Sequence, residues 1–115
     1  MDVDEKQRER FARLEIRATM LKAIAHPTRL FILDELSGGK RCVCELTEMI
    51  GADVSTVSKH LAVLKGAGIV RDEKEGLKVY YSIAIPCALD FFGCVDRVIR
   101  KEAETRLKLV SDEKE

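Results

Sequence analysis

The chain has 115 residues and no net charge, and its composition is 46% hydrophobic and 35% charged. This length fits one domain whose core would gain from a partner subunit, and the composition excludes a disordered chain. No apolar run is long enough to cross a bilayer, and the opening segment MDVDEKQRER is the opposite of a signal peptide. A cytoplasmic protein without a membrane partner is therefore expected. Because the net charge is zero, a nucleic-acid partner would have to meet a local basic surface.

The first part of the chain predicts two helices. Apolar residues recur at steps of three and four between residues 5 and 25, which is the period of one helix face. The dipeptide His26-Pro27 interrupts this pattern, because proline disfavours helical geometry in the residue before it and suits the first turn of a new helix. The second helix is expected to run from Pro27 to about Leu36, where the sequence SGG ends it.

Two shorter helices follow in close succession. The first is expected over roughly 42–50, with Gly51 as its C-terminal stop. The second is expected over about 54–65, with Asp53 as its cap. Its buried stripe is predicted to be Val54, Val57, Leu61 and Leu64. Two helices joined by a turn of about three or four residues form a helix-turn-helix arrangement.

The segment GIVRDEKEGLKVYYSI predicts a hairpin, with strands at about 69–73 and 77–83 around a turn at 74–76. Pro86 then begins a last helix that carries an apolar stripe along one side for several turns. Packing this stripe against the first helix and against the same elements of a second copy would bury it in a two-fold dimer.

These elements predict a mainly α fold with a β-hairpin wing, that is, a dimeric winged helix-turn-helix protein. The expected organisation is a single domain over residues 1–115. Within it, 5–25 and 86–110 are the dimerisation helices, and 42–83 hold the helix-turn-helix and the wing.

Polar residues on the fourth helix and the wing predict a surface that binds DNA. Short hydroxyls near the start of a recognition helix can reach base edges or phosphates, while lysines can neutralise phosphates. The segment 55–71 holds three basic residues and no acid, and basic residues of the wing could contact the DNA backbone or minor groove beside it. The candidate DNA-binding residues are Ser55, Thr56, Ser58, Lys59, His60 and Lys65 in the helix and Arg71, Lys74 and Lys78 in the wing.

The order of these motifs resembles the ArsR/SmtB family of winged helix-turn-helix repressors. The matching segments between Ala25 and Ile83 are AHPTRLFILDEL, CVCEL, STVSKHLAVLKGAGIV and a wing that ends in YYSI. The resemblance implies a homodimer that sits on double-stranded operator DNA until an inducer lowers its DNA affinity. It places the recognition helix at about 54–65, and the residues expected to read the DNA are Ser55, Thr56, Ser58 and His60.

The stretch CVCEL resembles the arsenic, antimony and cadmium or lead branch of that family, in which a CVC motif supplies thiolates. As(III), Sb(III), Cd(II) and Pb(II) are thiophilic, so Cys42 and Cys44 are expected to be the first ligands of an inducer ion, with As(III) or Sb(III) favoured. Residues two apart point to nearly opposite sides of a helix. Both sulfurs can therefore meet one ion only if the helix end unwinds or Cys42 lies before it.

The chain also departs from the arsenic-binding pattern. In that version a third cysteine often follows three residues after the second, and here that position is Thr47. Cys87 and Cys94, seven residues apart on the last helix, are therefore candidates for a further ligand from the same or the partner subunit. They could equally form a second site across the dimer, or simply pack as small apolar residues.

Other functions compete with this interpretation. A cysteine pair near a helix N-terminus could sense persulfide or oxidant in a repressor of the same fold. A thiol oxidoreductase is not favoured, because the usual pair with two intervening residues in a βαβ unit is absent, so no enzyme and no catalytic cofactor are expected. A protein-interaction module that lost DNA binding is a further alternative. A zinc or nickel site on the last helix is excluded because that helix has no histidine, and His26 and His60 are expected to be structural or DNA-facing.

Overall fold

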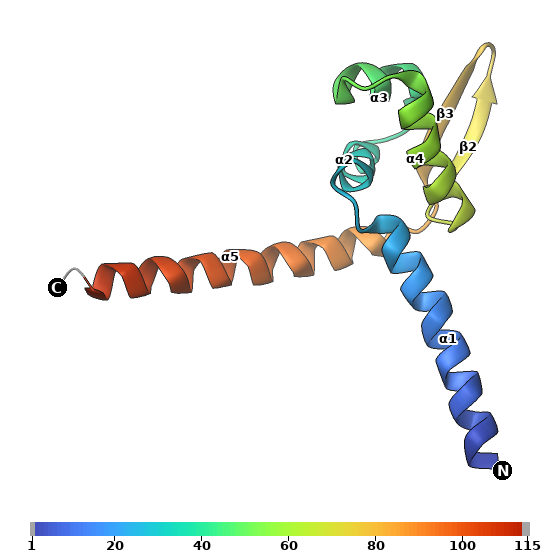
Figure 1. Ribbon diagram of the computed structural model, residues 1–115. Coiled ribbons are helices and arrows are strands. Elements are labelled where there is room, and N and C mark those ends of the chain that lie inside the picture. The colour runs from blue at the N-terminus through green and yellow to red at the C-terminus, as the bar shows by residue number, and fades with distance from the viewer. Residues whose placement is uncertain (1, 114–115) are drawn as a thin grey trace. The chain divides into compact units, whose positions relative to one another are not determined.

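The computed structural model describes residues 2–113, with side-chain surroundings for residues 4–111. It divides into two units, one ending at Ala84 and the other beginning at Ile85. The first unit holds α1 (Asp2–Ile24), α2 (Pro27–Leu36), β1 (Arg41–Cys42), α3 (Val43–Ile50), α4 (Val54–Gly66), β2 (Val70–Glu75) and β3 (Lys78–Ile83), and the second holds α5 (Cys87–Glu113) (Figure 1). The predicted mainly helical fold with a hairpin wing is confirmed.

The helix ends follow signals that were local in the sequence. His26 caps α2, because its Nδ1 accepts the backbone N–H of Thr28 at 3.1 Å. Asp53 caps α4 in the same way, with its Oδ1 2.8 Å from the backbone nitrogen of Thr56. Gly51 ends α3 with φ 77°, a left-handed conformation that glycine adopts without a Cβ clash. These three predictions are confirmed.

The core of the first unit lies where α2, α3 and α4 meet the base of the hairpin, and Figure 1 shows these helices gathered beside β2 and β3. The predicted stripe of α4 is confirmed at Val57, Leu61 and Leu64, each fully buried. It is wrong at Val54, which is 59% exposed in the first turn of α4. Burying one such side chain contributes about 1.5–3 kcal/mol. The other fully buried apolar residues include Ile32, Leu33, Leu46 and Ile69.

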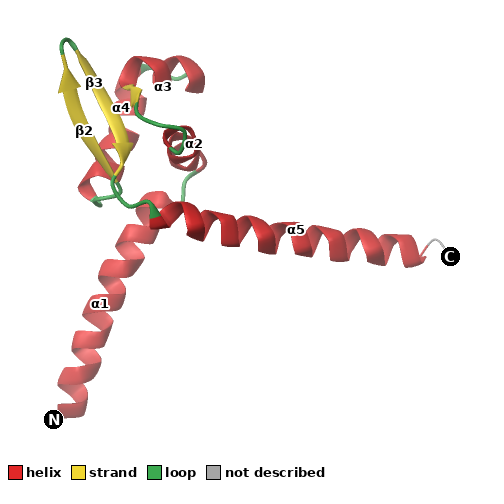
Figure 2. Cartoon of the chain, turned by 180° about the vertical axis from the view of Figure 1, so that it is seen from behind, coloured by secondary structure: helices red, strands yellow, loops and turns green. Residues whose placement is uncertain are grey.

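The wing is an antiparallel hairpin of β2 and β3 (Figure 2). Its turn consists of Gly76 and Leu77, because Glu75 pairs with Lys78. The sequence placed this turn at 74–76, so β2 extends further than predicted. Gly76 has φ 64°, which is the backbone conformation that tight hairpin turns require and glycine supplies. The sheet order is β1-β3-β2, so the wing strand β3 pairs on both sides.

The short strand β1 was not predicted. Its two residues pair with β3, Arg41 opposite Tyr81 and Cys42 opposite Tyr80. A two-residue strand has no periodicity of its own, and only its pairing with a distant segment defines it. The strand joins the start of α3 to the wing.

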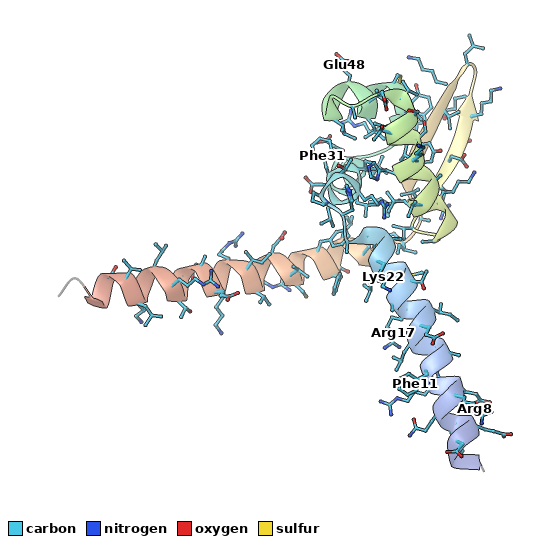
Figure 3. All side chains as sticks on the ribbon, viewed as in Figure 1. Arg8, Phe11, Arg17, Lys22, Phe31 and Glu48 are labelled. Atoms are coloured by element: carbon cyan, nitrogen blue, oxygen red, sulfur yellow. A yellow bond between two sulfur atoms is a disulfide. The ribbon has the colours of Figure 1, made fainter. Side chains whose placement is uncertain are left out.

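The two long helices expose most of their apolar side chains. Residues 4–22 of α1 are all exposed, including Phe11 at 62%, which Figure 3 labels on this helix. On α5, Val98, Ile99 and Leu107 are likewise exposed. Among the described residues, none of the helices combines the length and apolar character needed to span a membrane.

Candidate functional site

The N-terminal half of α4 presents hydroxyl and ammonium groups to solvent. Ser55, Thr56, Ser58 and Lys59 are all exposed, as expected for residues on the side opposite the buried stripe. The hydroxyl of Ser55 donates to the Asp53 carboxylate at 3.2 Å. This side of α4 therefore carries groups that can donate to phosphates or base edges, on a helix whose start is fixed by its cap.

Asp53 holds a negative charge at the start of α4. Its pKa lies below the ordinary value, because the hydroxyl and the backbone N–H of Thr56, and then the hydroxyl of Ser55, hydrogen bond to the ionised carboxylate. Near neutral pH this charge is favourable beside the positive end of the helix dipole.

His60 lies on α4 but is turned toward the start of α2. Its Nδ1 accepts a hydrogen bond from Nε of Arg29 at 3.1 Å, and its ring lies 4.6 Å from that of His26, centroid to centroid. Arg29 also donates to the carbonyl of Ala23 at 3.2 Å, near the end of α1. Because Nδ1 is engaged within the protein, only Nε2 of His60 is free to act as a donor toward another molecule.

These contacts make the stability of the first unit depend on pH. Burial first, and then the charges of His26 and Arg29, hold the pKa of His60 below its ordinary value. The unfolded chain would thus take up a proton as the pH falls through about 6.5 while the folded protein resists it, so stability is complete above that pH and decreases below it. We expect the urea midpoint of the wild type to fall between pH 7.5 and 5.5, and to fall less in His60→Asn. An equal fall in both proteins would contradict this role of His60.

The wing is less basic than the sequence prediction implied. Its basic residues Arg71, Lys74 and Lys78 are exposed as expected, but three acids lie among them. Lys65, at the end of α4, forms an ion pair with one of these acids, Asp72, at 2.9 Å. The pair raises the pKa of Lys65, through the hydrogen bond to Asp72 and then through its charge. Lys65 is therefore already neutralised in part, and the acids at positions 72, 73 and 75 carry the information that sequence reasoning passed over.

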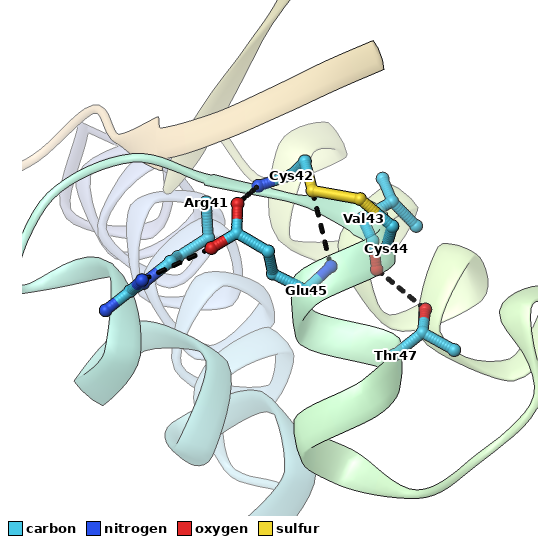
Figure 4. Close-up of a disulfide and its surroundings, with 6 residues drawn as sticks. All are labelled: Arg41, Cys42, Val43, Cys44, Glu45 and Thr47. Carbon is cyan, nitrogen blue, oxygen red and sulfur yellow. Dashed lines mark hydrogen bonds and ion pairs between the residues drawn. A yellow bond between two sulfur atoms is a disulfide. The ribbon is translucent and has the colours of Figure 1, made fainter.

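Cys42 and Cys44 are joined by a disulfide at the start of α3, with their Cα atoms 5.3 Å apart (Figure 4). Cys42 is the last residue of β1 and the N-cap of α3, so it lies before the helix while Cys44 lies within its first turn. This is the condition under which both sulfurs can face one another. The hydroxyl of Thr47, at the position of the family's third cysteine, donates to the carbonyl of Val43 at 2.7 Å.

A reciprocal capping box holds Cys42 in place. Its Sγ accepts the backbone N–H of Glu45, and its own backbone N–H donates to Oε1 of Glu45, both at 3.3 Å (Figure 4). Oε2 of Glu45 pairs with Arg41 at 3.2 Å, and Arg41 reaches Glu35 of α2 at 3.8 Å. The N–H of Cys42, and then the Arg41 guanidinium, lower the pKa of Glu45. The sequence signal was present in the spacing Cys-x-x-Glu, in which a cysteine replaces the usual serine or threonine.

Cys87 and Cys94 belong to the second unit, where both are exposed on α5. The Sγ of Cys94 accepts a hydrogen bond from Nη2 of Arg97 at 3.1 Å. With Cys42 and Cys44 in the disulfide, the described part of the chain contains no cluster of three or more His, Cys, Asp or Glu side chains placed to hold a metal ion.

Two adjacent helices, the second with polar residues exposed, followed by a hairpin, define a winged helix-turn-helix protein. Residues 26–72 match the family model described as bacterial regulatory protein, arsR family. The HTH-type transcriptional regulator Rv0081 of Mycobacterium tuberculosis is 31% identical over 85% of this chain and 87% of its own length. The chain belongs to the ArsR family of transcriptional regulators.

Two further relatives match over about half of their own length. The repressor SmtB of M. tuberculosis is 38% identical over 62% of this chain and 53% of that protein. A homologue of the cadmium resistance regulator CadC from Staphylococcus aureus is 42% identical over 57% of this chain and 55% of that protein.

Solved structures agree with the fold. The crystal structure of Rv0081 superposes with a TM-score of 0.75 at 32% identity, covering 82% of this chain and 95% of that one. The solution structure of Mb0332 from Mycobacterium bovis, described as a homodimeric winged helix-turn-helix DNA-binding domain, has a TM-score of 0.74 at 35% identity and covers 83% and 88% of the two chains.

Proposed function

We propose that this regulator is a dimeric cytoplasmic repressor without enzymatic activity, which leaves its operator when a thiophilic ion binds Cys42 and Cys44. The observation that carries the proposal is the position of Cys42. This residue ends the strand that pairs with the wing and caps α3, which packs against α4. An ion that rearranges the two sulfurs therefore acts on the wing and on the support of the recognition helix at once.

The donor atoms decide which ions are candidates. Two thiolates favour soft ions, so As(III) or Sb(III) are the proposed inducers, with Cd(II) and Pb(II) as further candidates. A third donor would come from Cys87 or Cys94, of the same or the partner subunit, or from a hydroxide or small thiol. The name of the CadC relative, which refers to cadmium resistance, supports an ion of this class.

The coordination of bound arsenite tests this site. X-ray absorption at the arsenic edge should give at least two sulfur neighbours in the reduced protein. Loss of one sulfur neighbour in Cys87→Ser or Cys94→Ser would assign the third ligand, and retention of the same number would assign it to the solvent or to a small thiol. Arsenic with only oxygen neighbours would contradict the proposal.

The proposed DNA interface is the exposed side of α4 together with the wing. Ser55, Thr56, Ser58 and Lys59 would contact base edges and phosphates in the major groove. The amount of positive charge on the wing is limited by its own acids, so the basic residues Arg71, Lys74 and Lys78 are proposed to make phosphate contacts beside the site. His60 and Lys65 would first have to exchange their partners within the protein.

Lys59→Ala should weaken binding to all DNA sequences, because a phosphate contact carries no base information. Loss of one such contact should reduce the slope of log K against log salt by about 0.9. Fluorescence anisotropy with operator and unrelated duplexes at several salt concentrations measures both quantities. The matched control is Lys101→Ala, which removes the same charge from α5. A loss confined to the operator would show instead that Lys59 reads bases.

Dimerisation is proposed through the two long helices. The apolar side chains that α1 and α5 expose, such as Phe11 on α1 and Leu107 on α5, are the kind of surface that a second copy would cover. The homodimeric state given for the Mb0332 domain supports this arrangement.

A second candidate function is favoured by the disulfide itself. The pair is placed so that two-electron oxidation can join Cys42 to Cys44, which suits a repressor that responds to oxidant or persulfide. Operator release by polysulfide or a thiol oxidant, without release by any of the four ions, would favour this function over ion sensing.

A further inference from the structure

The two sulfurs of the pair occupy unequal positions. Cys42 is only 1% exposed, whereas Cys44 is exposed on the first turn of α3. The Sγ of Cys42 accepts a hydrogen bond from the backbone of Glu45, and Cys42 also pairs with Tyr80 of the wing strand β3. Within the described residues, Cys44 has no comparable hydrogen bond through its sulfur, and its bond to Cys42 is its one covalent cross-link. Accessibility and structural coupling thus belong to different residues.

We propose a division of roles that rests on the proposed function: Cys44 captures the thiophile, and Cys42 transmits its binding to the DNA-binding elements. An incoming reagent meets Cys44 first because its side chain is accessible. Occupation of Cys44 alone leaves the cap of α3 and the pairing of β1 with β3 intact. Only engagement of the Cys42 sulfur disturbs both.

For trivalent arsenic the capture proceeds in two balanced steps. In the first, the Cys44 thiol replaces one hydroxide of As(OH)₃: an As–S bond forms, an As–O bond breaks, and the thiol proton leaves with the hydroxide as water. In the second, Cys42 replaces another hydroxide in the same way. Arsenic remains trivalent throughout, so neither an oxidant nor a reductant is required.

The second step is the one that reaches the DNA-binding elements. An ion bound by both sulfurs sets the distance between them, so Cys42 has to move relative to the first turn of α3. Its backbone and side chain share the capping box with Glu45, which is also tied to Arg41 of β1. The movement is therefore passed to β1 and the wing, and to α3 with Leu46, its fully buried contact with the core.

Thiophiles that bind one sulfur or two separate these roles. Methylmercury binds a single thiol, and phenylarsine oxide binds two. The probes are applied to the reduced full-length wild type, to Cys42→Ser, which keeps Cys44, and to Cys44→Ser, which keeps Cys42. The double variant Cys42→Ser/Cys44→Ser gives the contribution of Cys87 and Cys94, which is subtracted. Mass spectrometry of peptides reports the rate and extent of labelling, and anisotropy reports the operator Kd of each variant relative to its own unlabelled form.

Methylmercury should label Cys44 faster than Cys42. Labelling should change the operator Kd of Cys42→Ser less than about twofold, and should raise that of Cys44→Ser by about tenfold or more, within the usual range of allosteric coupling. Equal increases in the two variants, a larger increase in Cys42→Ser, or an unchanged Kd in fully labelled Cys44→Ser would overturn the division of roles. If phenylarsine oxide failed to release the wild type from its operator, the proposed function itself would fall, and the division of roles with it. Release of the wild type together with equal effects in the two variants would remove the division of roles alone.

Discussion

Cys42→Ser should give a protein that still binds its operator and no longer responds to arsenite. Serine is a good N-cap, so its hydroxyl can accept the Glu45 N–H that the sulfur accepts now. A hydroxyl is a hard ligand and does not replace a thiolate toward trivalent arsenic. The ratio of operator Kd with and without arsenite, about 5–150 for a typical allosteric coupling, should therefore fall to about 1.

The control for this variant is Thr47→Ser, one turn further along α3. The substitution keeps the hydroxyl that bonds to the Val43 carbonyl, so it should leave the response to arsenite intact. Anisotropy titrations of operator duplex with reduced protein measure all three proteins. Normal release in Cys42→Ser would remove Cys42 from the sensing site, and loss of operator binding without inducer would mean that its sulfur has more than a sensory role.

Leu61→Ala should produce the largest loss of stability. Leu61 is fully buried on the stripe of α4. Removing a buried leucine side chain typically costs about 2–5 kcal/mol, through lost transfer free energy and the cavity left behind. A loss of this size is a large part of the 5–15 kcal/mol that stabilises a typical small protein, so binding by the recognition helix should weaken as well.

The comparison for this variant is Leu77→Ala, because Leu77 at the wing turn is 100% exposed. Urea unfolding followed by circular dichroism should show a large shift of the midpoint for Leu61→Ala and almost none for Leu77→Ala. Similar midpoints in the two variants would mean that the core is not centred on α4.

The helices were predictable because their ends depend on nearby residues. His26 before Pro27, Asp53 before α4 and Gly51 after α3 each act within one turn of the position that they determine. The buried side of α4 was also predictable from its period, except at Val54 in the first turn, where the helix is open to solvent.

Contacts between distant segments were not predictable in the same way. The pairing of Cys42 with Tyr80 joins residues with no common periodicity, and the bond between Arg29 and His60 spans 31 positions. The role of His60 is therefore altered by a partner that its own helix does not reveal. The capping box at Cys42 is different, because its spacing to Glu45 was visible in the sequence.

The most direct test of the account is a titration of the fully reduced protein, bound to its own promoter DNA, with arsenite, antimonite, Cd(II) and Pb(II). Reduction opens the Cys42–Cys44 disulfide, so both thiols are available to the ion. The account predicts that at least one of these ions releases the DNA when about one ion is bound per pair of thiols, with a rise in Kd of about fivefold or more. Saturation of the thiols by all four ions without any change in DNA affinity would contradict it.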